Sequence, residues 1–296
     1  MAAVTRLKLT GRSRALALLA VCAGVAASAQ DAARVYPLTL TTGSRLVIEA
    51  KINGRPVSAL LDSAAEATFL DRGFARALGL KGGEAVAGQG SGQAAFETTL
   101  VSGVTLEAVG LSLTDQTVGV TDLGDVGRRL LGHPIDVILG REIFDAARLA
   151  IDIDGHSIAV VTRTQQPRGV RLELVTEHGV ETLPASVAGS APVRATFDLG
   201  NGSQVLISRA LAERLKLLGA GNAVRTERGG GLGGETERQL LTLEYLELAG
   251  RRFTGIEAAV DPQPSASDLN VGVSVLRHFR ITTDYAQHAV WLEPRD

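Results

Sequence analysis

Two aspartates occupy similar places in the two halves of this 296-residue chain. Asp62 follows the residues "SALL" and Asp198 follows the residues "RATF", so each carboxylate comes at the end of a segment that resembles a buried strand. Burying a charge is costly unless the charge is paired or hydrogen-bonded. When two carboxylates lie close together, one pKa rises and the pair shares a proton, so that it can act as a base and an acid at once. A lone aspartate at such a place would instead cap a turn.

Four features recur in the same order in both halves, which indicates an internal duplication. They are an acid after a strand, a short helix, a glycine-rich loop and an apolar closing segment that contains a glycine. In the first half these features are Asp62, residues 70–80, "GQGSG" at 88–92 and Gly140; in the second half they are Asp198, residues 208–218, "GGGLGG" at 229–234 and Gly272. If the two halves pack about a pseudo-twofold axis, the two acids meet near that axis.

The remaining sequence predicts an all-β protein with few short helices. Apolar residues mostly alternate with polar ones or form short runs, and Asn53-Gly54 and Asp154-Gly155 are typical of hairpin turns. Only residues 70–80 and 208–218 have the spacing of apolar residues that a helix needs. Asp152 and Asp284 also recur, but both stand where a strand meets a turn, and a turn role is expected for them.

The first 29 residues have the composition of a secretory signal peptide. A basic start is followed by the apolar run Ala15–Ala27, and Ala27-Ser28-Ala29 resembles a cleavage site before Gln30. The apolar run is too short to span a bilayer. We therefore expect a periplasmic or secreted protein with no membrane span after signal removal. A lipoprotein signal at Cys22 is the weaker alternative, because bulky Val21 precedes that cysteine.

Composition excludes several kinds of function. Cys22 is the only cysteine of the chain, so thiol catalysis and cysteine-ligated zinc are excluded in the mature protein. Removal of the signal segment, which contains four basic residues, leaves 26 Lys and Arg against 32 Asp and Glu, a net charge of −6 for the mature chain. No basic patch predicts a nucleic-acid partner. The five histidines lack metal-ligand spacing. They are at positions 133, 156, 178, 278 and 288.

The first aspartate segment resembles the active-site motif of the retropepsin-like aspartyl proteases. In "LLDSAAEATFL" the matching positions are Leu60, Leu61, Asp62, Ser63, Ala65, Thr68 and Leu70. The later apolar-apolar-Gly segment of that family is matched by Ile138-Leu139-Gly140. The second copy, "TFDLGNGSQVL", keeps Asp198, Gly200 and Leu206, and its closing segment is the looser Asn270-Val271-Gly272. The resemblance covers nearly the whole chain after the first 29 residues.

This resemblance implies two similar β-barrel lobes related by a pseudo-twofold axis, at 30–162 and 170–296, joined by a linker at 163–169. It implies a monomeric peptidase that cleaves a peptide or protein substrate and needs no metal or other cofactor. Asp62 and Asp198 would be the catalytic residues. Ser63, Ala64, Thr68 and Gly200 would support them. The glycine loops would be flaps that close over the substrate, with Gly88, Gln89, Gly90, Ser91 and Gly92 in one and Gly230, Gly231, Leu232 and Gly233 in the other.

Two positions depart from the family pattern. Ala64 stands where the family has a glycine beside the carboxylates, and its methyl group either crowds the site or is accommodated. Leu199 stands where the family has a Thr or Ser that bonds across the lobes, so only Ser63 can make such a bond. These departures leave a second hypothesis open, a non-catalytic module that binds extended peptides in the cleft between the lobes.

Overall fold

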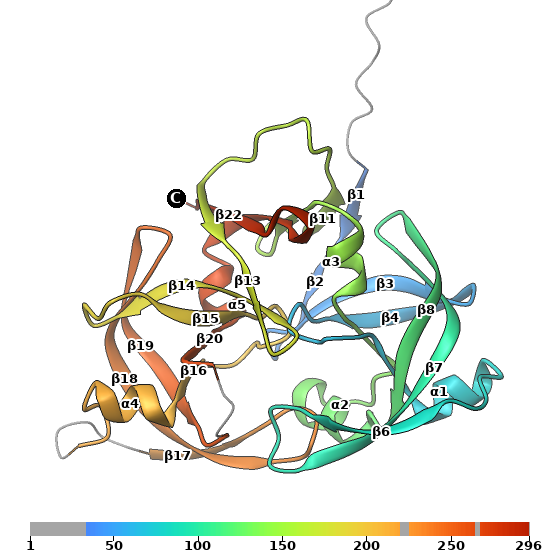
Figure 1. Ribbon diagram of the computed structural model, residues 1–296, viewed down its shortest axis with the longest axis horizontal. Coiled ribbons are helices and arrows are strands. Elements are labelled where there is room, and N and C mark those ends of the chain that lie inside the picture. The colour runs from blue at the N-terminus through green and yellow to red at the C-terminus, as the bar shows by residue number, and fades with distance from the viewer. Residues whose placement is uncertain (1–33, 220–224, 264–266, 296) are drawn as a thin grey trace, which may run out of the picture. The chain divides into compact units, whose positions relative to one another are not determined.

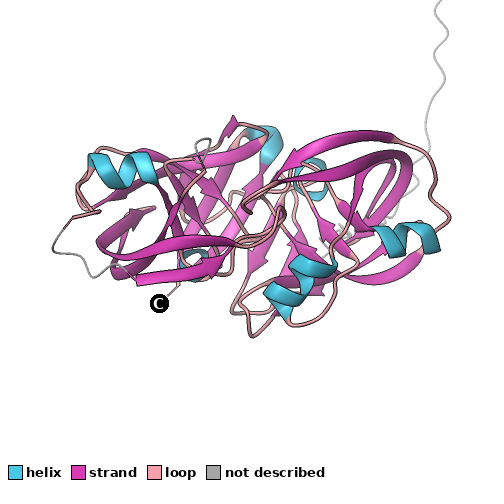
Figure 2. Cartoon of the chain, turned by 90° about the horizontal axis from the view of Figure 1, so that it is seen from below, coloured by secondary structure: helices cyan, strands magenta, loops and turns pink. Residues whose placement is uncertain are grey.

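The computed structural model describes residues 34–219, 225–263 and 267–295, which all belong to one compact unit. The predicted signal peptide and its cleavage site before Gln30 therefore lie outside the described residues. Figure 2 shows that strands make up most of the described chain and that the helices are short. The all-β prediction is confirmed.

Each repeat folds into a sheet in which eight strands follow the same order. In the first repeat the order is β2 (Thr39–Leu40), β3 (Leu46–Ile52), β4 (Arg55–Leu61), β9 (Val137–Leu139), β5 (Phe69–Asp71), β8 (Leu111–Thr121), β7 (Ala95–Ala108), β6 (Glu84–Gln89). In the second repeat it is β13 (Val175–Glu177), β14 (Val180–Val187), β15 (Val193–Phe197), β20 (Leu269–Val271), β16 (Val205–Ser208), β19 (Arg251–Asp261), β18 (Thr236–Leu248), β17 (Arg225–Gly229). The extra pairing of β3 with β7 is repeated as β14 with β18. The duplication is thus present in the topology as well as in the sequence.

A third sheet takes strands from both repeats. Its order is β1 (Val35–Pro37), β11 (Ser157–Val160), β10 (Leu149–Asp152), β21 (Phe279–Asp284), β22 (Ala289–Pro294), β12 (Val170–Glu173). The repeats join at the antiparallel pair β10 and β21, where Ile151 faces Ile281. In Figure 1 this sheet lies between the first repeat, drawn blue to green, and the second repeat, drawn yellow to red. Residues 163–169, the predicted linker, contain no helix or strand.

The two predicted helices are present but shorter than expected. They are α1 (Arg72–Ala77), capped by the side chain of Asp71, and α4 (Arg209–Arg214), capped by that of Ser208. The prediction that only these segments are helical was wrong, because the described chain also contains α2 (Gly124–Leu131), α3 (Glu142–Ala146), α5 (Val273–Leu276) and the 3-10 turn η1 (Tyr285–Gln287). α3 and α5 are single turns, too short for a periodic pattern, and α2 has two glycines among its eight residues, which lowers its helix propensity.

Strand packing fixes where each acid emerges. β4 ends in Leu61 and β15 ends in Phe197, both fully buried, so the next residue leaves the core at the same point of each sheet. The backbone N–H of Asp62 donates to the carbonyl of Leu139 at 2.9 Å, and that of Asp198 donates to the carbonyl of Val271 at 3.1 Å. The closing strand of each repeat therefore holds the base of its acid-bearing loop.

Glycine is required immediately after each closing strand, because the acid-bearing loop crosses over it. A Cβ at Gly140 would lie 2.5 Å from the carbonyl carbon of Ala67, and one at Gly272 would overlap the carbonyl oxygen of Asn201. These contacts give a physical reason for the paired glycines that the repeat analysis found 132 residues apart.

Asp152 and Asp284 have different surroundings in the folded protein. Asp152 accepts a bond from the N–H of Gly155 at 2.7 Å, which agrees with its predicted turn role. The turn role predicted for Asp284 was wrong. Its side chain is fully buried and accepts bonds from Arg148 at 3.0 Å and Arg163 at 2.9 Å. Asp284 is thus a buried carboxylate shared by a buried arginine, Arg148, and a partly exposed one, Arg163.

Candidate active site

The loop that carries Asp198 packs against Asp62 where the repeats meet. The N–H of Ala64 donates to Oδ1 of Asp62 at 2.9 Å, and the equivalent N–H of Gly200 donates to Oδ1 of Asp198 at 2.8 Å. Gly200 also packs directly on the other acid, since a Cβ at this position would overlap the carboxyl group of Asp62. The loop that carries one carboxylate therefore touches the other, and both aspartates are partly buried.

Burial and mutual repulsion favour a shared proton on this pair. Burial is the largest cause, and with the neighbouring charge of Asp198 it raises the pKa of Asp62 to about 7. Burial also raises the pKa of Asp198, but hydrogen bonds and the charge of Arg45 oppose the shift. The proton of the singly ionised pair is therefore better placed on Asp62, and the negative charge on Asp198.

Hydrogen-bond donors distinguish the two acids. Oδ2 of Asp198 accepts a bond from Nδ2 of Asn270 at 2.6 Å, and its Oδ1 accepts a second backbone bond from Asn201 at 2.9 Å. The side chain of Asn201 in turn donates to Oδ1 of Asn270 at 2.9 Å, which orients the amide toward the acid. Donors to a carboxylate favour its ionised form. Sequence reasoning missed Asn270; the available signal was a single amide in the otherwise apolar strand β20.

Ser63 links the two repeats beneath the acids. Its side chain is buried, and its Oγ donates to the carbonyl of Phe197 at 2.8 Å while it accepts the N–H of Leu199 at 2.8 Å. The side chain of Leu199 is fully buried in the core. The cross-lobe bond expected from Ser63 is therefore present, and apolar packing occupies the equivalent position in the second repeat.

Ala64 and Thr68 act differently from each other. Ala64 keeps the backbone bond to Asp62, so its methyl group is accommodated. Thr68 does not bond to either acid: its N–H and hydroxyl both donate to the carboxylate of Glu142 at 2.8 Å, and its Oγ1 accepts the N–H of Gly140 at 3.1 Å. Thr68 thus ties the acid-bearing loop to the closing segment.

The two glycine loops are hairpin tips that meet each other. One joins β6 to β7 and the other joins β17 to β18, and their tips approach at the bottom of Figure 1. The N–H of Gly92 donates to the carbonyl of Leu232 at 2.9 Å, that of Ala94 to the carbonyl of Gly233 at 3.0 Å, and that of Gly231 to Oγ of Ser91 at 2.9 Å. The loops are therefore closed onto one another.

Close packing explains much of the glycine content of these loops. A Cβ at Gly90 would overlap the carbonyl of Leu232, and Gly230 and Gly233 have φ values of 105° and 92°. Gly88 and Gln89 lie within β6, before the tip; Gly88 packs on the ring of Phe96, where a Cβ would be 2.5 Å from it. Gly88 and Gln89, predicted to lie in a flap, are thus part of the hairpin's stem.

The second-repeat loop is held down by the first repeat. Leu232 packs against an apolar cluster whose buried members are Leu60, Leu123, Val126, Ile135 and Ile138. Arg129 of α2 donates to the carbonyl of Gly230 at 2.6 Å and to that of Gly231 at 2.9 Å. One apolar anchor and one arginine of the first repeat therefore hold this loop in addition to the bonds between the two loops.

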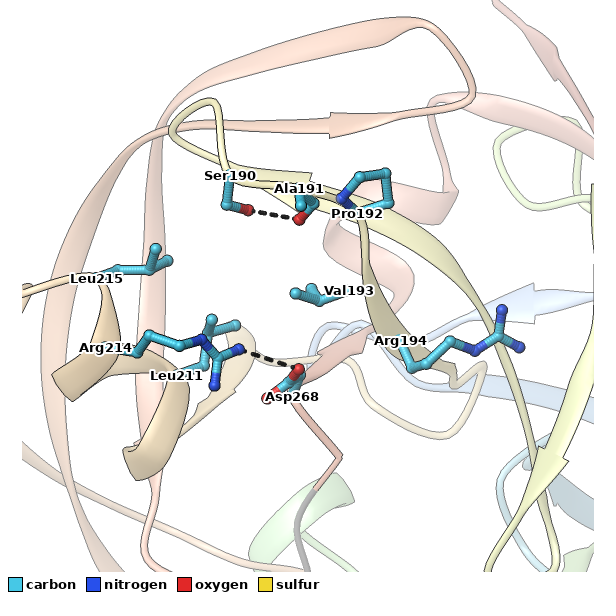
Figure 3. Close-up of a pocket in the computed structure, with 9 residues that line it drawn as sticks. All are labelled: Ser190, Ala191, Pro192, Val193, Arg194, Leu211, Arg214, Leu215 and Asp268. Carbon is cyan, nitrogen blue, oxygen red and sulfur yellow. Dashed lines mark hydrogen bonds and ion pairs between the residues drawn. The ribbon is translucent and has the colours of Figure 1, made fainter.

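The surface of the described residues has at least two cavities. One of about 350 Å³ lies beside the closed loops, lined by residues that include Phe96, Glu97 and Leu232. The other, of about 410 Å³, lies by α4 and contains Arg214, whose Nη2 is 3.3 Å from Oδ2 of Asp268 (Figure 3). Neither is lined by Asp62 or Asp198. Within the described ranges no three His, Cys, Asp or Glu side chains gather as a metal site, and no helix there is long and apolar enough to cross a membrane.

Duplicated β lobes, each with an aspartate on the loop after an inner strand, define the class of aspartic-protease folds. Residues 48–143 and 183–275 both match the aspartyl protease family, one match in each repeat. The chain belongs to this family, and its retropepsin-like resemblance is confirmed. None of the curated proteins compared with the chain matches it.

Proposed function

We propose that the protein is an aspartic endopeptidase that uses Asp62 and Asp198 to hydrolyse peptide bonds. The observation that carries this proposal is the contact between the two acid-bearing loops, where Gly200 packs on the carboxyl group of Asp62. Burial and the facing acid raise the pKa of Asp62 to about 7. A pair that holds one proton in this range has the two groups that water-mediated hydrolysis needs.

The unequal hydrogen bonding of the two acids assigns their roles in this proposal. Asp198, supported by Asn270, is the base: it takes a proton from a water molecule as the water oxygen attacks the scissile carbonyl carbon. Asp62 is the acid and gives its proton to the carbonyl oxygen. When the tetrahedral diol collapses, the proton on Asp198 passes to the leaving nitrogen and a hydroxyl proton returns to Asp62. The pair ends in its starting state.

The closed loops set the conditions for substrate entry. In this proposal the bonds between the loops, such as that of Gly92 to Leu232, break when an extended peptide enters. The loops would then close over the bound peptide and exclude water. Glycine at both tips allows close approach to a peptide backbone.

We further propose that the enzyme acts as an exported monomer, in the periplasm or outside the cell, on peptide or protein substrates. The amino-terminal sequence supports export. The duplication supports a monomer, because a single chain already supplies both acids.

Cleavage of a mixed peptide library from acidic to neutral pH tests the proposal. We expect cleavage that pepstatin-type inhibitors block and that Asp62→Asn and Asp198→Asn each abolish. Cleavage that survives both changes would exclude the paired-acid mechanism. Saturable peptide binding without cleavage at any pH would favour the non-catalytic binding module, for which the apolar Leu199 in place of a bonding hydroxyl is the supporting observation.

A further inference from the structure

Arg45 is a buried cation beside the paired acids. It precedes β3 and is only 5% exposed. Its guanidinium group lies against the acid-bearing loop of the other repeat: a Cβ at Gly202 would overlap Nη1, and Nη2 donates to Oγ of Ser203 at 3.2 Å. Nε and Nη1 are buried and have no hydrogen-bond acceptor among the described residues. Two nitrogens of this guanidinium, which carry three N–H groups, therefore remain without an acceptor in the described chain.

The repeat indicates which group is missing. Four residues after the first acid the chain has Glu66, whereas four residues after the second acid it has Gly202. The glutamate side chain lies at the interface between the repeats, close enough to Gly179 that a Cβ there would be 2.5 Å from its carboxyl carbon. The second loop thus lacks a carboxylate at the position that Arg45 covers.

The second repeat has no cation at the position equivalent to Arg45. Ile48 pairs with Ala59 in the first repeat, and Leu183 pairs with Ala195 in the second. Counting back three residues from Ile48 gives Arg45, and counting back three from Leu183 gives Val180. The second repeat therefore has an apolar residue where the first has a cation, so the two ends of the site differ in charge.

The acids themselves leave this cation only partly compensated. Asp198 and Asp62 are the anionic groups that act on Arg45, and burial opposes them, so that the pKa of Arg45 is lowered. A pair that shares a proton carries one negative charge, and neither acid accepts a hydrogen bond from the guanidinium within the described chain. Charge-assisted bonds between arginine and a carboxylate are among the strongest that a buried donor can make.

We propose that Arg45 forms an anion-binding subsite, which selects peptides with an aspartate or glutamate side chain at one position near the scissile bond. The carboxylate accepts from the Nε and Nη1 groups of Arg45, which have no acceptor within the described chain. Ser203, which is exposed to solvent, marks the side from which the carboxylate approaches. This proposal rests on the proposed function, because it names the substrate class of the same site.

The test uses pairs of peptides that differ only by Glu or Gln at one position on either side of the cleaved bond. For the wild-type protein we expect one position at which the Glu peptide has a kcat/KM at least tenfold above that of the Gln peptide. Binding of the same pairs to the Asp62→Asn protein, followed by fluorescence anisotropy of labelled peptides, gives a second readout that needs no cleavage. There too the Glu peptide should bind at least fivefold more tightly.

Two variants assign this preference to Arg45. Arg45→Gln should reduce the Glu-to-Gln ratio to below twofold. Ser203→Asp should also reduce the Glu-to-Gln ratio to below twofold, because it places a carboxylate of the chain next to the guanidinium. Ser203 is exposed to solvent. Arg214→Gln is the matched control: it makes the same change at an exposed arginine in the cavity of Figure 3, and should leave the ratio unchanged.

The outcomes are separable. A wild-type ratio below twofold at every position, in cleavage or in binding, would overturn the subsite. So would a ratio that persists in both Arg45→Gln and Ser203→Asp. Absence of cleavage with a preserved binding preference for Glu would reject the peptidase but support the anion subsite.

Discussion

Ser63 and Leu199 occupy equivalent positions one residue after the two acids, yet only the side chain of Ser63 makes hydrogen bonds to the other repeat. Oγ of Ser63 accepts the N–H of Leu199 and donates to the carbonyl of Phe197, both at 2.8 Å, whereas Leu199 contributes only apolar packing. The link between the repeats under the acids is therefore asymmetric, and the two positions should respond differently to substitution.

Ser63→Ala should destabilise the protein and slow cleavage. It leaves a buried N–H and a buried carbonyl without their shared partner, a change that costs about 1–3 kcal/mol. The acids would also be held less tightly relative to each other. Urea unfolding and kcat/KM measure the two effects. Ser63→Thr is the control, because it keeps the hydroxyl; equal losses in Ala and Thr variants would show that volume and not hydrogen bonding matters here.

Leu199→Thr should also destabilise the protein, although it restores the hydroxyl of the family pattern. The leucine is fully buried, so the change removes apolar contacts and buries a hydroxyl, at about 2 kcal/mol or more. Thermal unfolding measures this, with Leu199→Met as a control that conserves volume. A Leu199→Thr protein as stable as the wild type would mean that a reciprocal cross-lobe bond forms.

The sequence predicted the features that repeat along the chain. Two acids at equal spacing, two short helices and two glycine loops were visible because each feature occurs twice in the same order. The hairpin at Asn53-Gly54 was predictable from local turn chemistry, and the structure pairs Ile52 with Arg55 across it. Local and repeated signals thus sufficed for the fold class.

Features formed by single pairs of distant residues could not be predicted. Arg45 meets Ser203 over 158 positions, and Arg148 meets Asp284 over 136 positions. Asn270 departs from the apolar residue at the matching position, Ile138, and only the folded chain shows that its amide reaches an acid. The contacts that make the two acids unequal are therefore outside the reach of a periodic pattern.

Asp62→Asn should change how stability depends on pH. The raised pKa of Asp62, about 7 against an ordinary 3.8, means that the folded chain keeps a proton that the unfolded chain releases between about pH 4 and pH 7. The free energy of unfolding should then fall as pH rises through this window. The asparagine variant should show a flatter dependence in urea unfolding.

Asp284→Asn should change the pH dependence of the free energy of unfolding in the opposite direction. Its two arginine partners lower the pKa of Asp284, so its contribution is present above pH 3.8 and is lost as pH falls. This substitution should therefore weaken the protein most at neutral pH. A wild-type stability that rises between pH 4 and pH 7, with no change in the Asp62→Asn slope, would contradict the assignment to Asp62.

Arg129→Gln should loosen the second-repeat loop. The arginine donates to the carbonyls of Gly230 and Gly231, and hydrogen bonds from a charged donor each contribute about 1.5–3 kcal/mol. Hydrogen exchange at the loop should then rise roughly tenfold or more. Arg128→Gln on the same helix, where the arginine is exposed, is the matched control. Equal exchange in both variants would mean that Leu232 and the bonds to the first-repeat loop keep the loop closed without Arg129.

Asn270→Leu should shift the pH dependence of cleavage in one direction. The amide donates to Asp198, the proposed base, and this bond lowers the pKa of that acid. Without the amide the pKa of Asp198 rises, and the base is ionised only at higher pH. The acidic limb of kcat/KM should therefore move up by about one to two pH units, since a bond of 1.5–3 kcal/mol corresponds to that shift. The alkaline limb, at which the acid Asp62 loses its proton, should move less, although the two values belong to the pair. A drop in kcat/KM with both limbs unmoved would show that Asn270 only positions the loop. An alkaline limb that moves more than the acidic one would reverse the assignment of acid and base.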